Sequence, residues 1–308
     1  MKKIIIDCDP GLDDAVALIA AFGAKDLCVL ALTTVAGNVK GPQTAYNARV
    51  IREVSGQDES VPVSEGAPRP ILRDAVTAED FHGSTGLGGI DYPDPVLPLS
   101  GEHAVNTIIR LCRDAKDAPL TLIITGPMTN AALALTMAPD IQSGIAEIVL
   151  MGGADTEGGN ITPFAEFNIY ADPHAAAVVF GCGLPIRCLS LDVTHGIRTT
   201  KARLAAVRAV GNKQALAAGD LLDASCKLEF SAKSDRDAPL HDPSTVLAFT
   251  HPHLFKGRKA NVSVVTEVGE QFGRTVPTFA ESGNVLWYET ADDDAVFAAL
   301  CGLLEGHS

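Results

Sequence analysis

The chain of 308 residues has no apolar run near the roughly 20 residues that a membrane-spanning helix requires. It is also poor in positive charge, with 24 lysine and arginine residues against 38 aspartate and glutamate residues, and a net charge of −14. Nucleic acids and anionic membrane surfaces bind basic patches on proteins. We therefore expect neither nucleic acid nor a membrane as a partner.

Paired cysteines are missing as well. The seven cysteines are scattered, without a Cys-x-x-Cys pair, and most lie within apolar stretches. This pattern is typical of reduced core residues and not of disulfides or a thiolate metal site. No export signal is recognisable either, because Asp7 and Asp9 interrupt the first apolar segment too early. A cytoplasmic location is the resulting expectation.

The apolar residues that are present alternate between two periodicities. Apolar runs typical of strands occur at 2–7, 27–35, 120–125, 147–151 and 186–191, and helical patterns at 13–24, 42–54, 129–135 and 173–180. Strand–helix alternation predicts a largely parallel sheet with helices on both faces. Because no linker or repeat divides the chain, we predict one α/β domain over residues 1–308, with a central parallel sheet and a Rossmann-like core.

The last third of the chain has a different pattern. Residues 199–250 show the periodicity of consecutive helices, 261–266 and 285–289 have strand patterns, and 293–304 has the pattern of a final helix. The only tryptophan, Trp287, falls in the second of these strands. Packing in the core or at an interface is the commonest role of such a residue.

Three of the predicted strands are followed by glycine, at Gly37, Gly126 and Gly152. Glycine alone would indicate only a tight turn. In open parallel sheets, however, ligands bind at the edge formed by the carboxyl ends of the strands. The glycines therefore favour a shared site at this edge when they are considered together with the acidic segment that follows the first strand.

That acidic segment is the strongest signal in the sequence: Asp7-Cys8-Asp9-Pro10-Gly11-Leu12-Asp13-Asp14. Taken singly, Asp13 could cap the following helix and Asp7 could be satisfied by backbone donors. Four carboxylates beside a buried strand nevertheless repel one another unless protons or a cation intervene. Oxygen ligands without a nearby histidine or cysteine favour a hard divalent cation over zinc.

The pattern Asp-x-Asp-Pro-Gly-x-Asp-Asp resembles the signature of the nucleoside hydrolases, and the likeness continues to at least the segment 241–243. The resemblance implies a calcium-dependent enzyme that hydrolyses the N-glycosidic bond of ribonucleosides. It implies that Ca²⁺ is bound by the side chains of Asp9, Asp14 and Asp242 and by the main-chain carbonyl of Thr125. Asp9 would also accept the proton of the attacking water. A homodimer or homotetramer is expected on the same basis.

The resemblance also implies residues that contact the substrate. The expected sugar-binding residues are Asp13, Asn38, Asn160, Glu166 and Asn168. His241 would act as the acid for the departing base, and His82 would lie on a flap over the site. Without the resemblance, the amides and the carboxylate at 160–168 could simply solvate a long loop. A polar cage around the sugar hydroxyls would reject sugars that lack one of them.

Two other functions and the choice of base stay open. A ribose- or nucleoside-binding protein without catalysis would bind nucleosides but release no base. A haloacid-dehalogenase-type phosphatase also ends its first strand with Asp-x-Asp, but Pro10-Gly11 and the second acid pair fit it poorly. Relatives often place an aromatic ring against the base where this chain has Phe230, flanked by the acidic residues Glu229 and Asp237.

Overall fold

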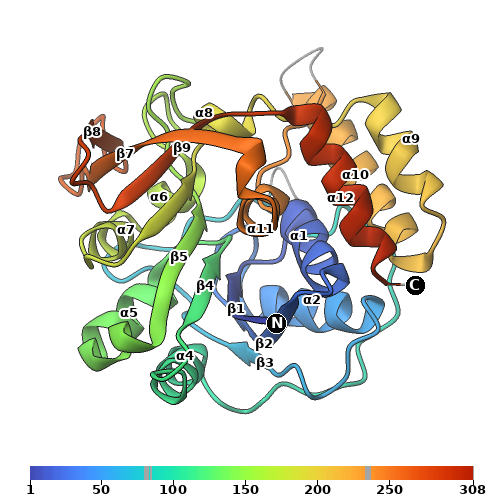
Figure 1. Cartoon of the computed structure of the whole chain (residues 1–308), viewed down its shortest axis with the longest axis horizontal. Helices are drawn as coiled ribbons and strands as arrows, with labels where there is room; N and C mark the ends of the chain where they lie inside the picture. Colours follow the sequence, from blue (N-terminus) through green and yellow to red (C-terminus); the bar gives the residue numbers. More distant parts are fainter. Residues whose placement is uncertain (80–82, 84, 233–236, 308) are drawn as a thin grey trace.

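The structure is a computed structural model that describes residues 1–79, 83, 85–232 and 237–307. The nine strands in these ranges form one sheet in the order β3-β2-β1-β4-β5-β6-β9-β7-β8 (Figure 1). The pairs from β3 to β9 in this order are parallel, whereas β7 runs antiparallel to both β9 and β8. The predicted single α/β domain with a largely parallel sheet is therefore confirmed.

The element bounds follow the alternating pattern through the first two thirds of the chain. The strands are β1 Lys2–Cys8, β2 Leu27–Thr34, β3 Val63–Glu65, β4 Leu120–Ile124, β5 Ile145–Met151, β6 Ile186–Leu189, β7 Phe255–Val264, β8 Thr275–Phe279 and β9 Val285–Ala291. The helices are α1 Leu12–Gly23, α2 Gly41–Val54, α4 Ala104–Asp114, α5 Thr129–Met137, α6 Phe167–Ala171, α7 Pro173–Phe180, α8 Leu191–Thr194, α9 Lys201–Ala209, α10 Lys213–Ala232, α11 Pro243–Thr250 and α12 Asp293–Glu305. Short 3₁₀ turns occupy Pro139–Gly144 and Pro252–Leu254.

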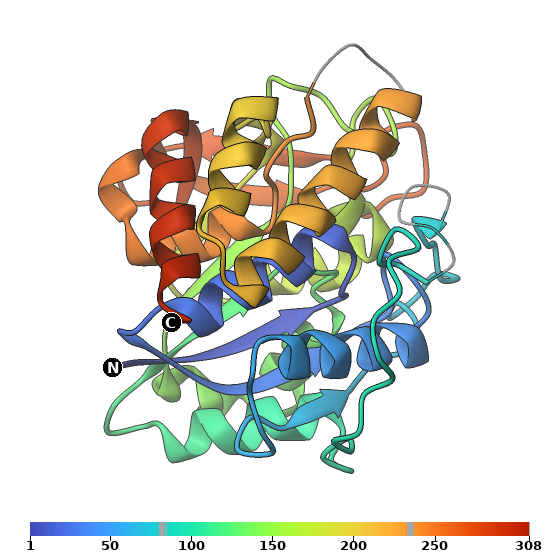
Figure 2. The same ribbon diagram turned by 90° about the vertical axis from the view of Figure 1, so that its right-hand side faces the viewer.

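Two hydrophobic cores, one on each face of the sheet, hold these elements together. In β1, Ile4 and Ile6 belong to one core and Ile5 to the other, as the alternation of side chains along a strand requires. Helices α1, α2, α10, α11 and α12 cover the first face, and α4, α5 and α7 cover the second. Figure 2 shows α9, α10 and α12 side by side. Helix α1 is apolar on most faces because it lies between the sheet and α10.

The consecutive helices predicted over residues 199–250 are present as α9, α10 and α11, and the last third needs two corrections, both in its strands. Strand β7 begins at Phe255, six residues earlier than predicted, since charged side chains alternate along its exposed face and hide the apolar pattern. Strand β8 was not predicted, because it contains Pro277, which an edge strand tolerates.

One expectation about burial is met. Trp287 in β9 is fully buried, as expected for core packing. No helix in the described ranges combines the length and apolar character needed to cross a membrane.

Candidate functional site

The carboxyl ends of β1, β2, β4 and β5 meet at one edge of the sheet, where the structure has a cavity of about 490 Å³. Most of the predicted site residues line this cavity: Asp13, Asn38, Thr125, Asn160, Glu166, Asn168, His241 and Asp242. Asp9 and Asp14 are fully buried and hydrogen-bond to the lining residues Asn38 and Thr125. His82 falls outside the residues that the structure describes.

Asp9 follows β1 directly and lies between two of the glycines that the sequence indicated. Its Oδ2 accepts the backbone N–H of Asn38 at 2.7 Å, and its buried Oδ1 has no hydrogen-bond partner in the described part of the chain. A Cβ atom at Gly37 would lie 2.1 Å from Oδ2, and one at Gly126 would lie 2.6 Å from Oδ1. The glycines therefore leave room for the Asp9 carboxylate in addition to forming turns.

Asp14, in the first turn of α1, connects three strand ends. Its Oδ1 accepts the hydroxyl of Thr125 at 2.7 Å, and its Oδ2 accepts the side-chain amide of Asn38 at 2.9 Å and the N–H of Gly11 at 3.1 Å. The start of a helix favours a carboxylate electrostatically. Asp14 is therefore held in place by groups from both sides of β1.

Three carboxylates gather at the floor of the cavity. Ligand oxygens of Asp13, Asp14 and Asp242 lie within 4.8 Å of one another. Burial raises the pKa of Asp9, Asp13 and Asp242, and neighbouring carboxylates raise it further for Asp9 and Asp242. A divalent cation would relieve this repulsion without protons.

The oxygen-only cluster and the unpartnered Oδ1 of Asp9 fit a hard cation such as Ca²⁺. The set of three carboxylates differs from the predicted ligands, because it contains Asp13 and not Asp9. The carbonyl oxygen of Thr125, another predicted ligand, accepts the side-chain amide of Asn168 at 2.7 Å. The ligand set implied by the family resemblance therefore stays a prediction.

The predicted sugar-binding loop is held by Glu166, the N-cap of α6. Its Oε1 accepts the N–H of Asn168 at 2.9 Å, and its Oε2 accepts the N–H groups of Gly153 and Ile169, both at 3.1 Å. Burial raises the pKa of Glu166 to about 7 although these donors act in the opposite direction. Asn160 is exposed, and its side-chain oxygen accepts the N–H of Phe167. The loop thus contributes two buried residues, Glu166 and Asn168, and one exposed residue, Asn160, to the lining of the cavity.

The lining of the cavity also contains two histidines, only one of which was predicted. His241 Nδ1 lies 2.8 Å from the Thr194 hydroxyl, and its ring centroid lies 5.7 Å from that of His195. His195 lies shortly after the end of β6, one of the predicted parallel strands. Its position near the carboxyl end of a strand is therefore the signal in the sequence that indicates it.

Helix α10 supplies a polar wall of the same cavity. Ser225 and Glu229 line the cavity, whereas Phe230 is 72% exposed and does not belong to its lining as far as the structure describes the chain. Phe230 therefore does not provide the aromatic contact that the sequence left open.

A carboxylate cluster that could hold a metal ion at the strand ends of a parallel sheet, with two histidines in the lining of the same cavity, is the arrangement expected of a metal-dependent α/β enzyme. The model of the family "Inosine-uridine preferring nucleoside hydrolase" matches residues 4–298. The chain belongs to this family, whose members hydrolyse the N-glycosidic bond of ribonucleosides and depend on a metal.

Individual relatives agree with this assignment. A pyrimidine-specific ribonucleoside hydrolase, RihA, of Photobacterium profundum is 41% identical over 89% of this chain and 88% of its own length. An uncharacterised protein of Schizosaccharomyces pombe is 38% identical over 97% of each chain. The structure of a purine-preferring ribonucleoside hydrolase from Gardnerella vaginalis superposes with a TM-score of 0.92 and 31% identity over 99% of both chains.

Proposed function

We propose that this enzyme is a calcium-dependent hydrolase that releases the free base and ribose from ribonucleosides. The observation that carries the proposal is the buried carboxylate cluster at the cavity floor, where Oδ1 of Asp9 has no described partner. Asp9, Asp14, Asp242 and the carbonyl of Thr125 would hold Ca²⁺, as the family resemblance implies. Calcium, when bound, would supply positive charge that orients a water and the sugar hydroxyls and lowers the pKa of that water.

The protein's own groups then carry out the remaining steps. Asp9 accepts a proton from the water whose oxygen attacks the anomeric carbon, and the bonding electron pair leaves with the base. The carboxylate of Asp13 stabilises the positive charge that develops on the sugar ring. His241, oriented through Nδ1 by Thr194, donates a proton to the departing base. The proton taken up by Asp9 returns to solvent, and His241 regains a proton from solvent, so that the cycle closes.

The base is proposed to be a pyrimidine. Several relatives that are 39–41% identical to this chain are named pyrimidine-specific ribonucleoside hydrolases. The wall that α10 contributes is polar, through Ser225 and Glu229, which suits recognition of the base by hydrogen bonds. We also propose, from the scattered unpaired cysteines, that the enzyme works in the cytoplasm and, from the resemblance, that it forms a homodimer or homotetramer.

The proposal is tested by base release from uridine, cytidine, inosine, adenosine and nicotinamide riboside, each with and without a chelator. We expect release that the chelator abolishes and added Ca²⁺ restores, with uridine and cytidine cleaved fastest. Magnesium added in place of calcium serves as the control for the identity of the ion. Chelator-resistant release would contradict the metal dependence, and faster release from inosine would contradict the base preference.

The sugar cage should discriminate strongly against 2′-deoxyribonucleosides. The buried polar groups that hydrogen-bond the 2′-hydroxyl lose their partner when the sugar lacks this hydroxyl. We therefore expect kcat/KM to fall by on the order of 10³-fold. The comparison of uridine with 2′-deoxyuridine measures this loss, and 5′-deoxyuridine tests the other end of the sugar. Similar rates on uridine and 2′-deoxyuridine would show that Asp13 and its neighbours do not bind the 2′-hydroxyl.

A further inference from the structure

The short helix α8 (Leu191–Thr194) brings several polar groups to the part of the cavity that His195 and His241 line, where the base is proposed to lie and which is named the base end. Thr194 contacts Nδ1 of His241, and His195, the C-cap residue, lines the cavity itself. Asp192, one turn earlier, points in another direction, toward the loop that follows β5. Helix α8 is therefore the element that positions both histidines.

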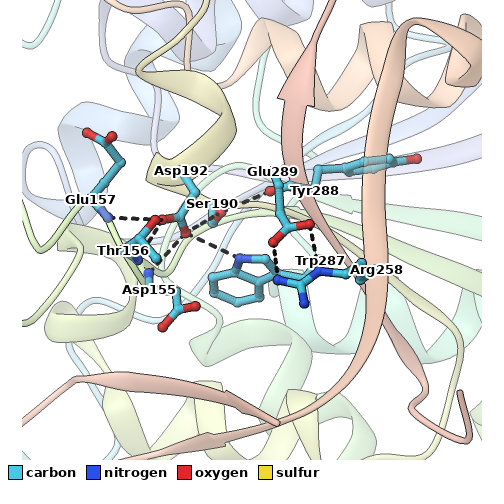
Figure 3. Close-up of polar contacts among 9 residues, drawn as sticks. All are labelled: Asp155, Thr156, Glu157, Ser190, Asp192, Arg258, Trp287, Tyr288 and Glu289. Atoms are coloured by element: carbon cyan, nitrogen blue, oxygen red, sulfur yellow. Dashed lines mark hydrogen bonds and ion pairs between the residues drawn. The ribbon is translucent and has the colours of Figure 1, made fainter. Parts of the chain in front are cut away.

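Asp192 anchors the segment 155–157 to α8. Its carboxylate accepts the three backbone N–H groups of this segment at 2.8–3.0 Å, the hydroxyl of Ser190 at 3.0 Å and the indole N–H of Trp287 at 3.2 Å (Figure 3). Burial opposes the charge of Asp192, but these hydrogen bonds keep its pKa below the ordinary value. The backbone at residue 157 is thus fixed by an ionised, well-satisfied group.

Glu157 in turn orients His195. Its Oε2 lies 3.1 Å from Nδ1 of His195. An ionised carboxylate only accepts hydrogen bonds, so the hydrogen of this contact belongs to Nδ1, and Nε2 is the ring nitrogen left to act on a ligand.

The two rings lie close enough to face one ligand. Their centroids are 5.7 Å apart at an interplanar angle of 54°, and both residues line the same cavity. Each ring is held through Nδ1, one by Thr194 and the other by Glu157. A base that occupies this end of the cavity would meet both histidines.

We propose that His195 is a second base-contacting histidine, which donates a hydrogen bond from Nε2 to the departing base, and that Glu157 is its positioning residue. This inference rests on the proposed ribonucleoside hydrolysis. As the C1′–N bond breaks, the electron pair moves to the base, and the hydrogen bond from His195 offsets the negative charge there. The proton that finally resides on the base still comes from His241.

The test compares uridine with p-nitrophenyl riboside, whose leaving group departs without protein assistance. For His195→Ala we expect kcat/KM on uridine to fall by about 10- to 100-fold, with the value on p-nitrophenyl riboside changed by less than about threefold. His195→Gln, which keeps a donor for Glu157, should show the same split. Glu157→Gln should show a smaller loss of the same kind.

The matched control is His253→Ala, which removes an exposed histidine from the other pair of close histidine rings, formed with His251. It should leave both substrates unchanged. Inhibition by ribose and the fluorescence of Trp287, which shares Asp192 with the anchored segment, report whether the loop itself has moved. Both should match wild type in the His195 variants.

The outcomes distinguish a failure of the proposed role of His195 from a failure of the proposed function. Equal losses on both substrates, or unchanged kcat/KM on uridine, would overturn the role of His195 while wild-type base release keeps the proposed function standing. A wild-type enzyme that cleaves p-nitrophenyl riboside but no nucleoside would overturn the proposed function instead.

Discussion

Asp9→Asn is expected to lower kcat on uridine by about 10³- to 10⁴-fold without unfolding the protein. The amide has the shape of the carboxylate and its oxygen can still accept the N–H of Asn38, so the strand end should persist. An amide cannot accept the proton of the attacking water, and it is a poorer ligand for a cation. The measurement is steady-state base release at saturating Ca²⁺, together with the melting temperature.

Asp7→Asn is the matched control for this variant. Asp7 is equally buried two residues earlier in the same segment, but its Oδ1 accepts hydrogen bonds from Thr33 and Asn130, away from the cavity lining. We expect its kcat to stay within about tenfold of wild type. Turnover by Asp9→Asn at more than a tenth of the wild-type rate would show that another group accepts the proton.

The amino-terminal carboxylates of the site were predictable because they are encoded locally, whereas Asp242 on the floor of the cavity was expected only from the family resemblance. Asp9, Asp13 and Asp14 lie in one segment at a strand–helix junction, and the repulsion among them indicates a cation without any knowledge of the fold. The parallel sheet was predictable for a similar reason, since its buried strands are continuous apolar runs. Both signals depend on residues that are neighbours in the sequence.

The base end of the cavity was not predictable in this way. His195 meets Glu157 across 38 positions of the chain and Thr194 meets His241 across 47, and no periodic pattern marks such pairs. Helix α8 has four residues, too few to show helical periodicity. Glu229 and Ser225 face the cavity while Phe230 faces solvent because of the rotation of α10, which tertiary packing determines.

Removal of the metal is expected to abolish base release and to lower the melting temperature by an amount that grows with pH. Burial raises the pKa of Asp7 and Glu166 to about 7 and that of Asp9 and Asp242 well above the ordinary value. Without metal, the folded protein therefore binds protons more tightly than the unfolded chain, whose carboxyl groups titrate near pH 4. Its stability falls as the pH rises from about 4 through 7.

Bound metal replaces the protons of Asp9 and Asp242, so the metal-loaded protein should lose less stability over the same range. At pH 5 protons compete with the metal and the two forms should melt close together. At pH 8 a metal concentration of about 100 times its Kd adds about 2.7 kcal/mol, or roughly 5 °C. Melting curves in chelator and in Ca²⁺ at pH 5, 6, 7 and 8 measure the difference.

Asp242→Asn isolates the contribution of the cluster. It removes a carboxyl group whose own pKa is raised by burial and by the neighbouring carboxylates, so the metal-free variant should be less sensitive to pH than metal-free wild type and should gain less from Ca²⁺. A melting difference between metal-free and metal-loaded wild type that is the same at pH 5 and pH 8 would contradict this account. The metal would then bind at groups that are already ionised at pH 5, and not at the buried carboxylates on the floor of the cavity.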